Sequence, residues 1–564
     1  MARRLIFLLF FLPLPPPAFP QDVSNTAEKI SAVKKIYDEG RWEDVVRAVP
    51  ESPDQPADLE LYRGLALAQL QRWPEAQKAL EASLRRNPRD KRFLVELAGI
   101  AYRQKQFSAA KTDLGHALKL ASGDDYANNF LASIYFLEGN LEGALKYWNR
   151  MGKPQLSDLS FDPQPHVHSL LLDRAFAFSP RTEWRRDSYL TTEARLDALQ
   201  IFMRTRFDLS AQSDGSFDLT FGSVERNGWG IGKWESLLSL LRGLPYLTVF
   251  PEFYNLDHSG LNWLSLVRWD DERRRVFSEI SAPIREDPKW RYRIYVDGRN
   301  ENWNITNTFR PAGASAASLN LEKAEVGAEI QSIVSGRWNW TNGVEYSYRR
   351  FRNLQGIAAA AVPFFTDGSS LSYRGRVERS LVRFPERRFT LDSSASGEFG
   401  TIFAKPLGNF GRVQGSLSSD WLPQARGEDY KMQTQLRGGR TVGKVPFDEM
   451  FMLGFERDND LWLRGHNGLR DGKKGNAPLG RNYVLANWET NKIAYDGAFF
   501  KVRVGPFLDS GKIYDPSGFF GSRKWLWDTG VQAKVRVLGS FEFVLGYGKD
   551  LRAGTNSFFT TVSR

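Results

Sequence analysis

The sequence predicts a multidomain protein in which helical repeats and a small α/β module precede a transmembrane antiparallel β-barrel of about 16 strands. Three observations lead to this fold class. Packing residues recur every 34 positions in the first part of the chain, a strand–helix–strand–strand order follows, and polar and apolar residues alternate from residue 230 to the end. The length of 564 residues is sufficient for several such domains.

The composition excludes several kinds of site. The chain has no cysteine, which rules out disulfides, thiolate metal sites, a cysteine nucleophile and a lipid-modified N-terminal cysteine. Of the five histidines, only His166 and His168 are close in sequence, so a histidine-based metal centre has little support. The mean hydropathy of −0.44 argues against a helical membrane protein. It is compatible with membrane strands, which are apolar on one face only.

Enzymatic and nucleic-acid functions are not indicated. The chain has no Gly-x-Ser-x-Gly elbow. The glycine-rich segment 228–233 lies outside any strand–loop–helix unit, so it is interpreted as a turn and not as a phosphate-binding loop. The net charge of +11 is spread over both halves of the chain, without a nucleic-acid-binding motif. We therefore expect neither an enzyme, nor a cofactor, nor a nucleic-acid partner.

Residues 1–20 have the features of a secretory signal. Arg3 and Arg4 precede an apolar stretch from Leu5 to Leu14, and prolines follow. The apolar stretch is too short to cross a bilayer as a helix. A retained anchor or a misread start codon is the alternative. Export of a chain without cysteine is typical of a bacterial periplasmic or outer-membrane protein.

Residues 24–155 contain an internal repeat of 34 positions. Small residues recur at two places in the repeat, where they let paired helices approach closely, and bulky residues occupy a third. The repeated positions are Gly64, Ala98 and Ala132, then Ala76, Ala110 and Ala144, then Trp73 and Phe107, with Pro88 at the end of one unit. This pattern resembles three to four tetratricopeptide repeats. Such an array implies a concave groove that docks a protein partner or client; the alternative is a stiff spacer.

A small α/β module is predicted at residues 165–227. Residues 151–165 contain three prolines and are interpreted as a linker, and residues 166–178 as a strand. A helix over 189–206 follows, and then two strands around a turn at Asp214-Gly215. This order resembles a single POTRA domain, the periplasmic module that precedes some outer-membrane barrels. His166 and His168 are interpreted as ordinary residues of the first strand.

Residues 230–564 alternate with a period of two. For example, Ile294 and Val296 share one face of a predicted strand, and Tyr295 and Asp297 share the other. The polar face is rich in charge, as a wet lumen requires, and the apolar face is rich in aromatic residues, as lipid interfaces require. Backbone groups in lipid must pair within the protein, which favours a closed sheet. At about 20 residues for a strand and its connection, the region accommodates about 16 strands.

Several C-terminal fragments together resemble the BamA/TamA superfamily of outer-membrane assembly and secretion proteins. These are residues 445–466, 475–489 and 507–511, the last including Phe507 and Gly511, and the end of the chain from residue 541. The resemblance implies a long loop that folds into the lumen and carries an aliphatic-Arg-Gly-aromatic motif. The matching residues are Leu463, Arg464, Gly465 and His466, where His466 replaces the usual aromatic residue.

The resemblance also implies acidic partners for Arg464 on inner-facing strands, at Glu489 and Asp509. The alternation independently places both carboxylates on polar strand faces. Gly465 is expected to permit a tight turn at the loop tip. The last residues, "TVSR", lack the terminal aromatic residue that is common in outer-membrane strands, which leaves the register of the last strand open.

The resemblance implies an outer-membrane protein insertion or translocation factor, with its N-terminal domains in the periplasm. Its partners would be outer-membrane lipid, client outer-membrane or secreted proteins, and a periplasmic protein bound by the repeats. Clients would be handled in the lumen or at a lateral seam between residues 235–250 and 556–563. The alternatives are a secretion pore dedicated to one substrate, and a structural or adhesive protein with a periplasmic tether.

Overall fold

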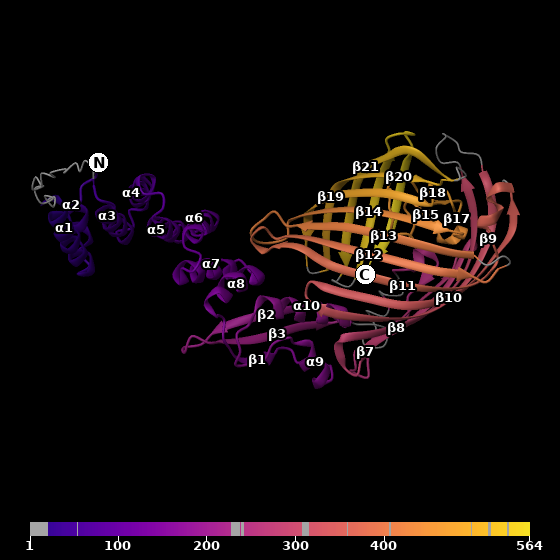
Figure 1. Cartoon of the computed structure of the whole chain (residues 1–564), viewed down its shortest axis with the longest axis horizontal. Coiled ribbons are helices and arrows are strands. Elements are labelled where there is room, and N and C mark those ends of the chain that lie inside the picture. The colour runs from indigo at the N-terminus through magenta and orange to yellow at the C-terminus, as the bar shows by residue number, and fades with distance from the viewer. Residues whose placement is uncertain are drawn as a thin grey trace, which may run out of the picture. The chain divides into compact units, whose positions relative to one another are not determined.

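The structure is a computed structural model (Figure 1). It describes residues 21–52, 55–226, 237, 242–306, 315–357, 359–404, 408–497, 499–516, 520–537 and 541–563, so the predicted signal at 1–20 lies outside it. The chain divides into two compact units, residues 1–134 and 135–564. None of the described helices is long and apolar enough to cross a membrane.

The first unit is a series of antiparallel helices that repeats every 34 residues, which confirms the predicted repeat. The helices are α1 (Gln21–Asp38), α2 (Trp42–Ala48), α3 (Ala57–Gln69), α4 (Trp73–Arg86), α5 (Lys91–Arg103), α6 (Phe107–Leu120) and α7 (Asp125–Leu137). Gly64 on α3 leaves space for Leu80 on α4, because a β-carbon on Gly64 would lie 2.6 Å from a methyl carbon of Leu80. Ala76, Ala98 and Ala110 are fully buried between helices.

The second unit begins near the end of α7 and includes α8 (Leu141–Trp148), which is followed by the small α/β module. The module consists of β1 (Leu156–Phe161), α9 (Ser169–Ala175), α10 (Arg186–Leu199), β2 (Phe202–Ala211) and β3 (Phe217–Glu225). In its sheet β3 lies between β1 and β2, parallel to β1 and antiparallel to β2. Both helices pack on the sheet through buried residues that include Leu172, Leu196 and Phe221.

Two sequence predictions for this module are wrong. Residues 166–178 are not a strand, because they contain α9, and the predicted linker 151–165 contains the strand β1. The run Leu170-Leu171-Leu172 places Leu171, Leu172 and Ala175 on one helix face that is buried in the module core, a spacing typical of a helix. His166 and His168 therefore lie in the connection before α9, and His168 is its N-cap residue.

The other predictions for the module agree more closely with the structure. The helix predicted at 189–206 is α10, which begins three residues earlier and ends at Leu199. The turn at Asp214-Gly215 is confirmed: Gly215 has a φ of 83°, and Asp214 Oδ1 accepts a hydrogen bond of 2.8 Å from Ser216 N. The module thus has one more helix than the sequence predicted.

The rest of the second unit is a closed antiparallel barrel, as predicted (Figure 1). β4 and β5 both pair with β6, so they form one interrupted strand; the described wall then has fifteen strands, close to the predicted number. The wall strands are β4 (Thr248–Val249), β5 (Glu252–Leu256), β6 (Leu261–Trp269), β7 (Arg273–Ile284), β8 (Asp287–Thr306), β9 (Ser315–Ser335), β10 (Trp338–Gln355), β11 (Gly368–Phe384), β12 (Phe389–Ile402), β13 (Gly408–Trp421), β14 (Tyr430–Gly443), β19 (Asn482–Asp496), β20 (Phe500–Tyr514), β21 (Gly521–Val537), β22 (Phe541–Asp550) and β23 (Asn556–Ser563).

The two faces of the wall have opposite chemistry. Along β8, Ile294 and Val296 point outward and are 51% and 45% exposed, whereas Tyr295 and Asp297 are buried inside. Outward-facing aromatic residues occur on strands around the wall, among them Trp263, Trp269, Trp338, Trp421, Trp488, Trp525 and Trp527. An apolar exterior over a charged interior is the pattern of a barrel in lipid.

A long connection between β14 and β19, residues 444–481, folds into the barrel. It carries the short strands β15 (Phe451–Met452), β16 (Leu469–Arg470), β17 (Lys473–Lys474) and β18 (Leu479–Gly480). β15 pairs with β18, and β17 pairs with the wall strand β8. The fully buried Leu463 packs with wall residues such as Leu485 and Ile513. We call residues 444–481 the lumen loop.

The second unit also joins α8 and the small module to the wall. Lys146 and Tyr147 on α8 both bind the carboxylate of Glu386, in the turn between β11 and β12. Thr191 on α10 accepts a hydrogen bond of 3.1 Å from Gly336 N, in the turn between β9 and β10. These turns, α8 and α10 therefore belong to one packed body.

Candidate functional site in the barrel lumen

The lumen loop places the guanidinium of Arg464 between two wall strands. Its Nε and Nη2 donate to the two carboxylate oxygens of Asp509 on β20, at 2.9 and 2.7 Å. Its Nη1 donates to Glu489 Oε2 on β19 at 2.6 Å. The structure thus brings Arg464 together with both acidic residues named from the sequence, in a bidentate pair and a second ion pair.

Further residues complete this cluster. Gln532 Oε1 on β21 accepts a hydrogen bond of 3.0 Å from Arg464 Nη1, and Lys534 on the same strand pairs with Glu489. The ring of Phe507 lies under the guanidinium, with 3.9 Å between the ring centre and the central carbon of Arg464. Gln532 and Lys534 share the polar face of one alternating strand, so the pattern that identified Glu489 also contained the signal for them.

The cluster is electrically balanced. Arg464 and Lys534 carry two positive charges, and Glu489 and Asp509 carry two negative charges. Arg464 is 3% exposed and Asp509 is completely buried. A buried carboxylate without its cation is strongly unfavourable, so Arg464 fixes the position of the loop tip against β19, β20 and β21.

Glycine is needed at position 465 for a different reason than the tight turn predicted from the sequence. It does not have a positive φ, so the turn itself does not require glycine. A β-carbon at this position would instead lie 2.7 Å from Asp528 Cγ and 2.7 Å from the backbone nitrogen of Asp550. Glycine is needed because the loop tip touches the wall at this point. Glycine is also needed on the wall at Gly548 of β22, where a β-carbon would overlap the carbonyl of Arg464.

His466, the next residue of the motif, also contacts the wall. Its Nδ1 lies 3.0 Å from Asp528 Oδ2 on β21, and its Nε2 lies 3.3 Å from Asp550 Oδ2 at the end of β22. Among the described residues, these three form a group of metal-ligand type whose donor atoms all lie within 4.8 Å of one another. Neither aspartate was identified as a partner from the sequence, although Asp528 shares the inward face of β21 with Gln532.

The remaining motif residues line the path of the lumen loop. Phe507 is buried beneath Arg464, and Gly511 leaves room for Leu453, to which its β-carbon would come within 3.0 Å. Loop residues outside the motif bind the opposite wall: Asp458 pairs with Arg268 at 2.6 Å, and Lys474 pairs with Glu301 at 2.8 Å. The loop is thus fastened to both sides of the lumen.

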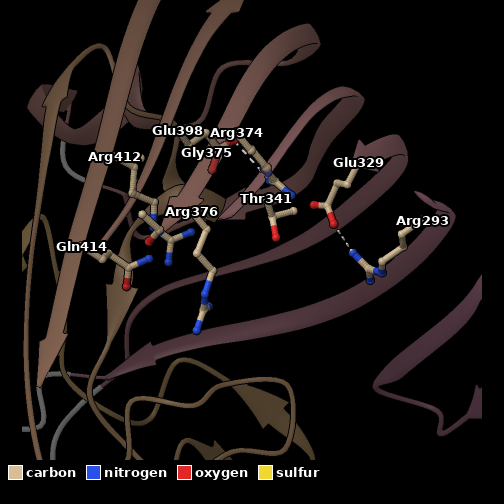
Figure 2. Close-up of a pocket in the computed structure, with 11 residues that line it drawn as sticks. Arg293, Glu329, Thr341, Arg374, Gly375, Arg376, Glu398, Arg412 and Gln414 are labelled. Atoms are coloured by element: carbon tan, nitrogen blue, oxygen red, sulfur yellow. Dashed lines mark hydrogen bonds and ion pairs between the residues drawn. The ribbon is translucent and has the colours of Figure 1, made fainter. Parts of the chain in front are cut away.

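Two polar cavities that share lining residues lie inside the wall formed by β7 to β13. One cavity of about 410 Å³ is lined by Arg293, Glu329, Thr341, Arg374, Gly375, Arg376, Ser396, Gly397, Glu398, Arg412 and Gln414. Figure 2 shows these polar side chains turned toward a common space, with Arg293 paired to Glu329. A second cavity of about 290 Å³ shares Arg293, Glu329, Thr341 and Arg376 with it. The lumen is therefore polar where the loop does not fill it.

The seam of the barrel lies where β23 neighbours β4. The predicted segment 556–563 coincides with β23, whereas residues 235–236 and 238–241 of the other predicted segment lie outside the described residues. Tyr246 Oη and Thr560 Oγ1, 2.7 Å apart, form a hydrogen bond across the seam. The register of β23 is now set: Phe558 points outward and is 78% exposed, and the buried Phe559 packs against the tilted ring of Phe455 in the lumen loop.

The chain has similarity to one protein family and to several solved structures. The family model described as tetratricopeptide repeat matches residues 61–114. No curated protein sequence matches the chain. Similar solved structures include BamA from Haemophilus ducreyi lacking POTRA domains 1–3, with 13% identity and a TM-score of 0.43 over 73% of this chain and 84% of that one. CdiB from Acinetobacter baumannii has 11% identity and a TM-score of 0.45, over 72% of this chain and 73% of that one.

CdiB from Escherichia coli has 12% identity and a TM-score of 0.47, over 73% of this chain and 75% of that one. At this level of similarity, the function has to be argued from the residues of the chain itself. The chain thus combines a region of tetratricopeptide repeats with a small α/β module and a closed antiparallel barrel.

Proposed function

We propose that the protein is a factor of the bacterial outer membrane that inserts or translocates client proteins, with its repeats in the periplasm. The observation that carries the proposal is the lumen loop, whose tip is fixed to β19, β20 and β21 by the balanced cluster around Arg464. A passive pore does not need a loop that fills its own lumen. The resemblance of the motif around Arg464 to the BamA/TamA superfamily supports the same function.

The seam is the place where we propose that clients are handled. Every consecutive pair of wall strands from β5 to β23 is antiparallel, and these fourteen steps leave β5 and β23 running in the same direction. β4 and β5 have two and five residues, and β23 has eight. A client strand that enters between them would be antiparallel to both edges, which is the favourable pairing in a hairpin-built sheet.

The absence of native cysteine makes the seam directly testable. In a Tyr246→Cys, Thr560→Cys variant, the two thiols lie across the seam, where a short bifunctional thiol reagent can bridge them. We expect bridging to stop client assembly or export in cells that depend on the protein. The matched control is Ser394→Cys, Ser416→Cys, two paired positions of β12 and β13, where bridging should have no effect. Normal client handling by the bridged seam variant would exclude the seam mechanism.

A dedicated secretion pore is the second candidate, because polar cavities remain in the lumen beside the loop. The two functions predict different effects when the protein is depleted from cells. Depletion of an insertion factor lowers the amounts of many outer-membrane proteins, whereas depletion of a dedicated pore removes one protein from the medium. Depletion that changes neither profile would favour a structural or adhesive role.

We also propose that the repeats bind a client or a periplasmic partner. Their support is the family match over residues 61–114, which describes an array of a kind that binds peptides in its groove. A pull-down with residues 24–160 as bait identifies the ligand. If no periplasmic or client protein is enriched over a bait with denatured repeats, the region acts as a spacer.

A further inference from the structure

His466, Asp528 and Asp550 meet at the loop tip although they come from three different elements. His466 belongs to the lumen loop, Asp528 to β21 and Asp550 to the end of β22. Their exposed fractions are 8%, 0% and 3%. Three buried side chains of metal-ligand type, with donor atoms within 4.8 Å of one another, are an unusual arrangement for a position that only needs an aromatic ring.

A backbone N–H group donates to one oxygen of each carboxylate, and both carboxylates face the histidine. Gly465 N donates to Asp528 Oδ2 at 2.6 Å, and Arg552 N donates to Asp550 Oδ1 at 2.8 Å. Within the described part of the chain, Asp528 Oδ1 and His466 Nε2 are buried and form no well-aligned hydrogen bond, although Oδ1 lies 3.0 Å from His466 Nδ1 and Nε2 lies 3.3 Å from Asp550 Oδ2. Such atoms are costly unless a ligand satisfies them.

The charge of the group also differs from that of the neighbouring Arg464 cluster. Within the described residues, the direct ion pairs of both carboxylates are with His466, and the positive charge of Arg552 acts on the histidine from nearby. The Arg464 cluster, by contrast, opposes two carboxylates with two cations. A divalent cation held by both carboxylates would offset their two negative charges.

We propose that His466, Asp528 and Asp550 bind a divalent cation, with Zn²⁺ as the best-fitting ion. The ligands would be one ring nitrogen of His466 and one carboxylate oxygen each from Asp528 and Asp550, a nitrogen and oxygen donor set that suits Zn²⁺. His466 Nδ1 lies 3.0 Å from both carboxylate oxygens of Asp528, and Nε2 lies 3.3 Å from Asp550 Oδ2, so the ring lies between the two carboxylates. The ion would tie the loop tip to β21 and β22, next to the seam strand β23.

This inference gives the lumen loop two anchors of different chemistry, and its importance for client handling rests on the proposed function. The Arg464 anchor depends on permanent charges. The His466 anchor would depend on metal supply, so removal of the ion would weaken the hold of the loop on β21 and β22 while the contacts of Arg464 remain.

The test measures metal on the purified full-length chain, so it is independent of client handling. The protein is incubated with Zn²⁺, freed of excess ion, and analysed for metal content; the melting temperature is then recorded with and without a chelator. We expect about one Zn²⁺ per chain and a melting temperature that falls on chelation. Co²⁺ in place of Zn²⁺ should give visible absorption bands that report nitrogen and oxygen ligands.

Two variants and one control complete the test. His466→Phe keeps a planar ring at the position where the resembled family has Phe or Tyr, and Asp550→Asn keeps the shape of the carboxylate. Both should lose the bound Zn²⁺ and the effect of the chelator. Asp297→Asn, which changes a buried lumen carboxylate paired with Arg275 and Arg299, should keep the ion. The proposal is overturned if the wild-type chain retains no Zn²⁺, or if His466→Phe retains as much as the wild type.

Discussion

The seam and the opposite wall of the barrel differ in almost every respect. The strands β8, β9 and β10 have 20, 21 and 18 residues, whereas β4, β5 and β23 have two, five and eight. Neighbouring strands in the wall are antiparallel, and the edges at the seam run in the same direction. Backbone pairing therefore stabilises the wall far more than the seam, which is where the barrel would open.

The helices before the barrel contact both the wall and one edge of the seam. Glu142 on α8 pairs with Arg383 on β11, and α10 binds the turn between β9 and β10. On the seam side, Asn262 on β6 donates a hydrogen bond of 2.8 Å to the carbonyl of Leu199, at the end of α10. The edge formed by β5 and β6 is thus held by the small module. We expect opening to move β23 and its neighbours away from this fixed edge.

The largest effect is expected where the loop meets the wall. Arg464→Ala would leave Asp509 and Glu489 buried without a guanidinium and should cost ~3–5 kcal/mol of stability. The measurement is the temperature at which the folded barrel loses its faster migration in a gel. Arg376→Ala, at an exposed lumen ion pair with Glu378, is the control and should cost ~0–1 kcal/mol. Unchanged migration and activity of Arg464→Ala would contradict the proposed anchor.

A smaller loss is expected from a single methyl group between the loop and β22. In Gly548→Ala the new β-carbon would overlap the carbonyl of Arg464, which should cost ~1–3 kcal/mol and displace the loop tip. In the wall, Gly415→Ala meets nothing closer than 3.8 Å and should have almost no effect. Equal melting temperatures of the two variants would show that the loop tip does not pack on β22 as described.

The junction of α8 with the wall should contribute less. Burial disfavours the charge of Glu142, but hydrogen bonds and ion pairs with Arg383 and Arg186 outweigh it and lower the pKa of this carboxyl. We expect Glu142→Gln to lower stability by ~1–2 kcal/mol above pH 5, since bonds to charged groups are lost. Limited proteolysis near residue 140 reports the loosening. Glu75→Gln, at an exposed helix pair, is the control; equal protease sensitivity of both would argue against the junction.

The smallest effect is a pH dependence within the small module. Burial raises the pKa of Glu193 on α10 to about 7. Because the folded state then holds this proton more tightly than the unfolded state, stability should fall as pH rises from about 4.5 through 7. Glu193→Gln should flatten this fall in the melting temperature, whereas Asp187→Asn, exposed on the same helix, should not. An unchanged profile in Glu193→Gln would show that this carboxyl does not titrate in that range.

The sequence predicted features that depend on short-range patterns. The 34-residue repeat follows from packing positions such as Gly64 and Ala98, and the wall follows from alternation such as that around Tyr295. The partners Glu489 and Asp509 lie on alternating strands next to a recognisable motif. These features could be predicted because each is encoded within one or two neighbouring elements.

Other features depend on contacts that the sequence does not encode locally. Asp528 and Asp550 meet His466 of the lumen loop, and the sequence does not show which inward-facing carboxylates of the wall the loop tip will reach. The helix α9 was missed because its leucine run Leu170–Leu172 was interpreted as a buried strand, and β1 was missed because prolines surround it. The role of Gly465 was misassigned because the close approach of the wall is a tertiary contact.

The difference between seam and wall can be measured directly in a bilayer by the distance between two spin labels. Val276→Cys on β7 and Val531→Cys on β21 span the seam, and Ile294→Cys on β8 and Val413→Cys on β13 are an equal number of strands apart across the wall. Both pairs should lie about 24 Å apart when the barrel is closed. The account predicts a single narrow distance in the wall and an additional longer distance across the seam when a client is bound. The same narrow distribution for both pairs, with client present, would contradict it.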